Sequence, residues 1–237
     1  MESSCGVIPE NRLKSSAVFR NSGADGEEIL KSAKLAHAAE NNRGFVVTMT
    51  DETYSFFYKN TASSDCTISK IRKLYGIQVK EFFTGAGSIN FALMEDGHLF
   101  SWWIEPAEDD GYEGFDADIV DPLGRYVSCS AANKMTSFCS PVLVTGSLTG
   151  VKIRQVALPG WNKTCTVGLS VGGDVHQWGS PQGRYRHASG RHWMPILIPK
   201  EHYGYQEITS IACNDRAGVA LTAKGEVINK ERFDKGS

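Results

Sequence analysis

The sequence predicts an all-β protein built from repeats of about 50 residues, each with about four short strands. Three observations lead to this expectation. The segments 79–103 and 155–179 align without a gap, and shorter copies lie at 208–228 and 43–57. Within each copy, apolar residues alternate with period two on both sides of a tight turn. Glycine makes up 24 of 237 residues, above the usual ~7 %, which favours turns over long helices.

The turns define the repeat. Asp51, Gly97, Gly173 and Gly225 occupy the same place in the four copies, where glycine accepts a positive φ at little cost. The steps between them are 46 residues (51 to 97), 76 residues (97 to 173) and 52 residues (173 to 225). Two steps suit one propeller blade each, and the long step implies an insertion of about 25 residues. We therefore expect three to four blades of a β-propeller.

Composition excludes several classes of protein. With 25 Lys and Arg against 27 Asp and Glu, the formal net charge is −2, which argues against nucleic-acid binding by bulk charge. No apolar run approaches ~18 residues, so we expect no membrane span. The N-terminus lacks a secretory signal pattern, and the six cysteines contain no C-x-x-C pair. We expect reduced thiols in an intracellular protein, cytoplasmic or nuclear and not secreted.

The chain divides into a polar lead, 1–42, and the repeats, 43–230. Within the lead, Ser22 to Ala39 has acidic residues early, basic residues later and alanines thereafter. Acid near the start and base near the end suit the helix dipole. We expect the lead to be partly helical or disordered, with a helix in this stretch.

The repeats resemble those of the regulator of chromosome condensation family. The last copy keeps the family pattern at Ala212, Cys213, Ala220, Leu221, Thr222, Gly225 and Val227. Earlier copies keep it at Ala92, Leu93, Asp96, Gly97, Phe100, Trp102, Val175, Trp178 and Gly179. Residues 43–103 look most like the first blades of the branch that carries a BTB domain after the propeller. The family's propeller has seven blades and these residues supply three to four, so the resemblance implies an incomplete propeller without a BTB segment.

An acidic insertion lies at 105–121. It contains eight carboxylates and no basic residue. The spacing does not supply a calcium loop. The remaining interpretations are a solvated loop between blades and a docking strip for a basic partner. Candidate binding residues of this strip are Asp109, Asp110, Glu113, Asp116 and Asp118.

A basic loop follows at 184–193, where positive charges alternate with aromatic rings. Such a loop can be a solvated segment, a protein-binding rim or, less well supported, a nucleic-acid contact. The histidines at 187, 192 and 202 lack the spacing of a zinc site. Candidate partner-binding residues are Arg184, Tyr185, Arg186, Arg191 and Trp193.

No nucleophile elbow, P-loop, zinc-protease motif or dinucleotide-binding glycine pattern occurs. Cys213 occupies the family's buried strand position, so we interpret it as structural, and Trp102 and Trp178 as packing residues. We expect a protein that is not an enzyme and has no cofactor and no metal. The resemblance implies a protein-binding scaffold, as in ubiquitin-ligase or trafficking assemblies. Two alternatives are a guanine-nucleotide exchange factor for a small GTPase, and a degenerate or partial propeller copy.

Overall fold

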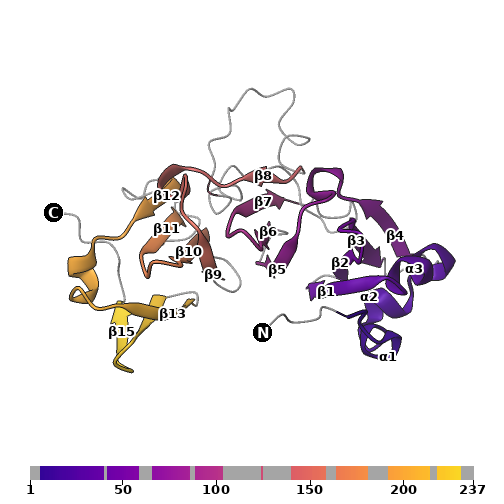
Figure 1. Ribbon diagram of the computed structural model, residues 1–237, viewed down its shortest axis with the longest axis horizontal. Helices are drawn as coiled ribbons and strands as arrows, with labels where there is room; N and C mark the ends of the chain where they lie inside the picture. The colour runs from indigo at the N-terminus through magenta and orange to yellow at the C-terminus, as the bar shows by residue number, and fades with distance from the viewer. Residues whose placement is uncertain are drawn as a thin grey trace. The chain divides into compact units, whose positions relative to one another are not determined.

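The computed structural model describes residues 6–39, 42–58, 66–85, 89–103, 124, 140–158, 164–180, 192–213 and 218–230. The chain forms two compact units, Met1–Phe82 and Phe83–Ser237. The described residues form four antiparallel sheets in which consecutive strands are neighbours (Figure 1). The prediction of an all-β fold with a short helical lead is confirmed.

The first unit contains three short helices and the first sheet. The helices are α1 (Glu10–Leu13), α2 (Ala17–Arg20) and α3 (Gly23–Leu30). The strands, in sheet order, are β1 (Ala33–Ala39), β2 (Arg43–Thr48), β3 (Thr53–Tyr58) and β4 (Cys66–Lys70).

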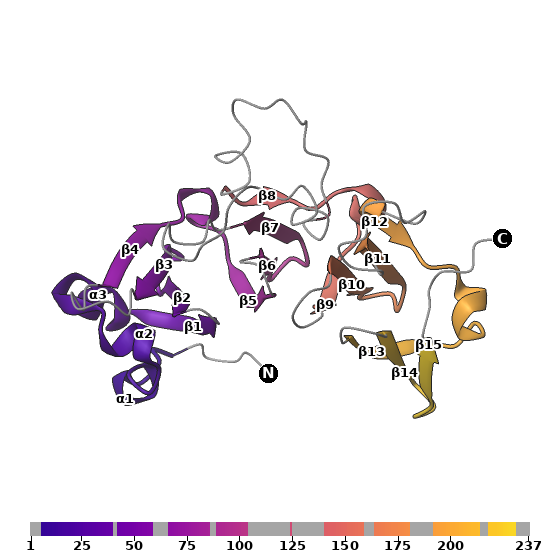
Figure 2. The same cartoon turned by 180° about the vertical axis from the view of Figure 1, so that it is seen from behind.

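The helices cover one face of the first sheet (Figure 2). The ring of Phe19 meets that of Phe56 edge-on, with 5.5 Å between centroids. Gly44 lies under the Phe19 ring, at a point where a Cβ atom would come within 2.7 Å of it. This face of the sheet is therefore closed by α1–α3, in the manner of a capping element on a repeat array.

The expected helix over Ser22–Ala39 is correct only for its first half. Helix α3 ends at Leu30, and Ala33–Ala39 is strand β1, paired with β2 from Ala33↔Thr48 to Ala39↔Arg43. Alanine has the highest helix propensity, but differences in propensity are below about 1 kcal/mol per residue for most residues, and pairing along a whole strand outweighs them.

The remaining sheets follow along the chain. The second consists of β5 (Val79–Thr84), β6 (Ile89–Met94), β7 (Leu99–Trp103) and β8 (Val142–Leu143). The third consists of β9 (Ile153–Ala157), β10 (Thr164–Ser170), β11 (Val175–Ser180) and β12 (His192–Leu197). The fourth has three described strands, β13 (Ile208–Cys213), β14 (Gly218–Thr222) and β15 (Val227–Lys230).

One turn geometry recurs in all four sheets. The aligned residues Asp51, Gly97, Gly173 and Gly225 have φ values of 59°, 89°, 82° and 82°. In each copy the backbone N–H of this residue donates to the carbonyl three positions earlier, at 3.0 or 3.1 Å. The sequence alignment of the turns is thereby confirmed.

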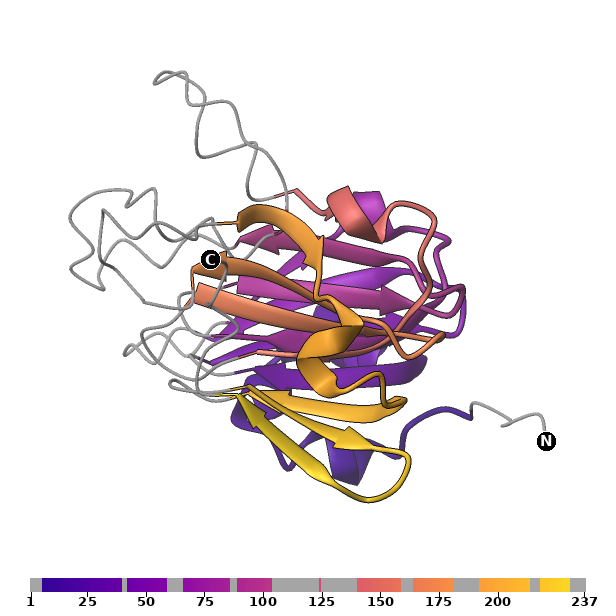
Figure 3. The same cartoon turned by 90° about the vertical axis from the view of Figure 1, so that its left-hand side faces the viewer.

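In Figure 3 the fourth sheet is in front and the third lies behind it. Apolar side chains fill the space between neighbouring sheets of the second unit. Phe91 and Leu93 of the second sheet pack against Ile153, Val156 and Trp178 of the third. The opposite face of the third sheet packs against the fourth through side chains of β9, β10, β11, β13 and β14. Both faces of the third sheet are therefore buried.

A polar clamp also joins the third sheet to the fourth. The Gln155 amide accepts from the Ile211 N–H at 3.0 Å and donates to the Ile211 carbonyl at 2.9 Å. The Ser210 hydroxyl donates to the same amide oxygen at 3.2 Å. The Arg154 guanidinium donates to the carbonyls of Ile208 and Thr209 at 2.8 and 2.9 Å. These bonds satisfy backbone groups on the edge of β13 that no described strand pairs.

Gln155→Ala should lower the free energy of unfolding by about 1–2 kcal/mol, because it leaves the Ile211 amide and carbonyl without their partner. Urea unfolding followed by tryptophan fluorescence measures the change. Thr209→Ala is the matched control, since it removes one hydroxyl bond to the Leu221 carbonyl on the same sheet. A smaller loss for Gln155→Ala than for Thr209→Ala would contradict the clamp.

Candidate functional site

The second unit presents two opposite rims formed by the strand ends. We call the rim with the turns at Gly97, Gly173 and Gly225 the turn rim. Its turns are linked to the adjoining chain, because the Ile153 N–H donates to the Gly97 carbonyl at 2.8 Å. The Val171 and Ala223 N–H groups likewise donate to carbonyls that precede β9 and β13, at 2.8 and 2.9 Å.

The opposite rim, which we call the loop rim, is where the acidic and basic segments leave the sheets. Strand β7 ends at Trp103 before the acidic insertion, and β11 ends at Ser180 before the basic loop. Both are third strands of their sheets, and each is antiparallel to the strand before it. The two oppositely charged segments therefore leave corresponding positions of the second and third sheets.

The predicted binding residues themselves lie almost entirely outside the described residues. This holds for Asp109, Asp110, Glu113, Asp116 and Asp118, and for Arg184, Tyr185, Arg186 and Arg191. Trp193 falls within strand β12, one residue after its start. The roles of all ten residues remain predictions.

The strands that lead to the loop rim are firmly anchored. Trp102 and Trp178 are almost fully buried, as is Trp103. The Trp178 ring meets the Phe91 ring at 6.1 Å between centroids. The interpretation of Trp102 and Trp178 as packing residues is confirmed. Cys213, also interpreted as structural, is half-buried beside the apolar side chains between the third and fourth sheets.

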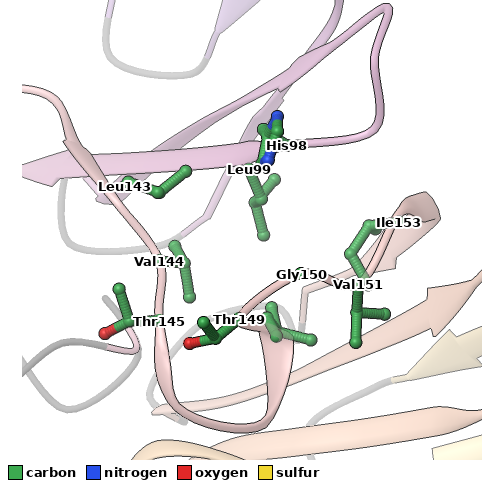
Figure 4. Close-up of a pocket in the computed structure, with 10 residues that line it drawn as sticks. His98, Leu99, Leu143, Val144, Thr145, Thr149, Gly150, Val151 and Ile153 are labelled. Carbon is green, nitrogen blue, oxygen red and sulfur yellow. The ribbon is translucent and has the colours of Figure 1, made fainter.

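A small apolar pocket opens at the turn rim (Figure 4). Its volume is about 60 Å³, and its lining is Leu99, Leu143, Val144, Leu148, Thr149, Gly150, Val151 and Ile153, with Thr145 and His98 beside them. His98 Nδ1 lies 2.8 Å from the Asp96 carboxylate. The His98 backbone N–H also donates to that carboxylate, and these bonds hold the pKa of Asp96 below its ordinary value. The pocket can accept one small apolar group beside a polar pair.

A half-buried serine and a buried histidine meet where the linker before β9 passes strand β11. The Ser147 hydroxyl, in the short 3₁₀ helix Gly146–Leu148, lies 2.8 Å from Nδ1 of His176 on β11. His176 is 2 % exposed, and its Nε2 has no hydrogen-bond partner among the described residues. The nearby carboxylate of Asp174 pairs with Lys200 at 3.0 Å. Among the described residues, no carboxylate forms a hydrogen bond with this imidazole, as the orienting group of an acyl-transfer site would.

Each linker between sheets contains a residue in the left-handed backbone conformation. A buried residue, Leu74, Leu148 or Tyr203, is followed two positions later by Gly76, Gly150 or Tyr205, with φ of 69°, 74° and 56°. Tyrosine is costly in this conformation, where glycine is favoured. The Tyr205 side chain is 75 % exposed, so packing does not compensate for the strain. This linker repeat was not predicted from the sequence, although the leucine and glycine shared by the first two linkers were a signal for it.

The described residues contain no group of three or more histidine, cysteine or acidic side chains that could hold a metal ion. Within the same residues, no helix is long and apolar enough to span a membrane.

Comparison with known proteins gives a structural likeness. No protein-family model matches the chain, and no curated protein matches it. The crystal structure of human WBSCR16 superposes with a TM-score of 0.54 at 21% identity, over 82% of this chain and 46% of that chain. Yeast RCC1 (Prp20), solved with Kap60, gives 0.39 at 13% identity, over 83% of this chain and 55% of that chain. The chain thus spans about half the length of these solved structures.

The likeness to WBSCR16 and the four antiparallel sheets together support a β-propeller fold like that of RCC1. The resemblance to the BTB-bearing branch and the number of blades remain predictions.

Tyr205→Gly should raise the free energy of unfolding by about 1 kcal/mol, because a left-handed non-glycine residue costs ~1–2 kcal/mol and the gain in unfolded-chain freedom offsets only part of this. Chemical denaturation measures the change. The matched control is Gly150→Ala, whose Cβ would meet no atom within 4 Å, so it should destabilise through the backbone alone. If Gly150→Ala is destabilised as expected but Tyr205→Gly is also less stable than wild type, Tyr205 is not strained in its left-handed conformation.

Stability should fall as pH drops below about 6.5. Burial lowers the pKa of the His37 and His176 imidazoles from the ordinary 6.5, so the unfolded chain binds protons that the folded state resists. The free energy of unfolding is therefore highest above that pH and decreases toward pH 5. The double variant His37→Asn, His176→Asn should show a flatter profile between pH 7 and 5. An equally steep profile in the variant would assign the dependence to other groups.

Proposed function

We propose that this chain is a non-enzymatic protein-interaction module whose partner binds at the loop rim. The observation that carries the proposal is the placement of two oppositely charged segments, 105–121 and 184–193, at corresponding strand ends of neighbouring sheets. Loops on a rigid β scaffold commonly carry binding function. Arginine, tyrosine and tryptophan, which the basic loop contains, dominate the energetics of protein interfaces.

The charge pattern indicates how a partner would be held. A bipolar strip attracts a partner with the complementary arrangement and disfavours the reversed orientation by like-charge contact. Such an interface should weaken as salt increases, because exposed charges are screened. We propose an adaptor role, as in ubiquitin-ligase or trafficking assemblies; a small GTPase is the alternative partner that the family resemblance suggests.

Replacing Arg184, Arg186 and Arg191 by alanine should reduce the partner proteins captured from a cell extract on immobilised chain at least tenfold at low salt. The melting temperature should stay within about 2 °C, because surface substitutions cost little stability. The control variant Lys73→Ala, Lys80→Ala, Lys224→Ala removes the same charge from exposed described positions and should leave capture unchanged.

Equal capture by the arginine variant and wild type would remove the basic loop from the interface. If the arginine variant and the lysine control lose the same amount of captured protein, the loss is due to the change in net charge and not to the basic loop. Stimulated release of labelled GDP from a panel of purified small GTPases would overturn the non-enzymatic assignment.

A further inference from the structure

A lysine ammonium group lies against two tyrosine rings and a carboxylate in the first unit. Lys70, the last residue of β4, places its Nζ 4.6 Å from the centre of the Tyr75 ring and 5.8 Å from that of the Tyr54 ring. The same Nζ donates to Glu52 Oε1 at 2.5 Å. We call Tyr54, Tyr75 and Glu52 the tyrosine cage. Its rings and its carboxylate all attract the same positive charge.

Contacts within the first unit hold the cage in place. The Tyr54 hydroxyl donates to Glu52 Oε2 at 2.7 Å, and the Tyr54 ring packs against the apolar cluster that the helices cover. The bonds from Lys70 and Tyr54 hold the pKa of the Glu52 carboxyl below its ordinary value, so this group is ionised at neutral pH. One oxygen of Glu52 therefore fixes the carboxylate, while the other binds the cation.

The fold does not require a cation at this position. In the first sheet, Lys70 lies opposite Tyr54. At the same distance from the turn, the second and third sheets have a leucine opposite the ring, Leu143 and Leu197. The repeat therefore forms equally well with an aliphatic side chain in place of the lysine. Packing between sheets does not account for the cage.

The cage is open to solvent, and its own lysine holds it weakly. Tyr75 is 58 % exposed, and the Lys70 side chain is 37 % exposed. Exposed ion pairs contribute little to stability, because both partners are well hydrated when they separate. A cation from outside can therefore replace the Lys70 ammonium at small cost, and the flexible lysine side chain then extends into water.

We propose that the tyrosine cage binds the dimethylated lysine side chain of a partner protein, which takes the place of the Lys70 ammonium. A dimethylammonium group keeps one N–H, which can donate to Glu52 Oε1 while the methyl groups lie against the two rings. A trimethylammonium group lacks this N–H. An unmethylated ammonium is more strongly hydrated and gains less from the rings. The site lies in the first unit, so the proposal is independent of segments 105–121 and 184–193.

Proton NMR titrations of the full chain with N-acetyl-dimethyllysine amide test this site, with the unmethylated and trimethylated amides for comparison. The methyl signals should move upfield on binding, because they enter the shielding region of the tyrosine rings. We expect the dimethylated amide to bind in the millimolar range, at least about threefold more tightly than either of the others. Tyr75→Leu should weaken this binding at least about fivefold. Its melting temperature should stay close to that of wild type, because Tyr75 is exposed.

Two lysine variants separate displacement of Lys70 from a general effect of charge. Lys70→Ala removes the competing ammonium and should tighten binding of the dimethylated amide about two- to fivefold. The matched control Lys73→Ala removes the same charge from the neighbouring exposed 3₁₀ turn and should bind like wild type. If neither wild type nor Lys70→Ala binds the dimethylated amide, the proposal is wrong. It is also wrong if the unmethylated amide binds as tightly, if Tyr75→Leu leaves binding unchanged, or if Lys70→Ala binds no more tightly than Lys73→Ala.

Discussion

Burial of apolar residues on both faces of the third sheet is the constraint on which the second unit depends. Strand β6 is buried along its whole length, and apolar side chains leave water only where other parts of the chain cover them. The third sheet satisfies this requirement with the second sheet on one face and the fourth on the other. A blade of this kind has no stable existence without its neighbours, and the stability of the array resides in the contacts between sheets.

The first sheet has one face that helices cover in place of a sheet. In the first unit, Leu13, Val18, Phe19 and Leu30 of the helices supply the apolar cover that another sheet would give. The side chains of β2 and β3 beneath them, Val46 and Phe56, are almost fully buried as a result.

The sequence predicted those features that depend on local pattern. Turn geometry at Asp51, Gly97, Gly173 and Gly225, the strands around it and the buried tryptophans all follow from alternation and glycine placement within one repeat. The same local pattern could not predict that β1 is a strand, because its alanines favour helix and only pairing with β2 makes it a strand. The hydrogen bonds of Gln155 could not be predicted from the sequence either, because its partners lie 55 and 56 positions further along the chain, on another sheet.

The two rims of the second unit differ in role: the turn rim is structural, and the loop rim is where we propose that a partner binds. At the turn rim, the Gly97 carbonyl accepts a backbone bond and the Val171 and Ala223 N–H groups donate one each. These bonds connect each turn to the chain between sheets, which leaves little room for insertions. At the loop rim, the strands end beside buried tryptophans, so long segments can be inserted there without disturbing the packing between sheets. The 76-residue step between Gly97 and Gly173 places the acidic insertion at this tolerant rim. A binding surface can therefore vary in length and charge there while the scaffold stays fixed, which is the physical reason to seek the partner at the loop rim.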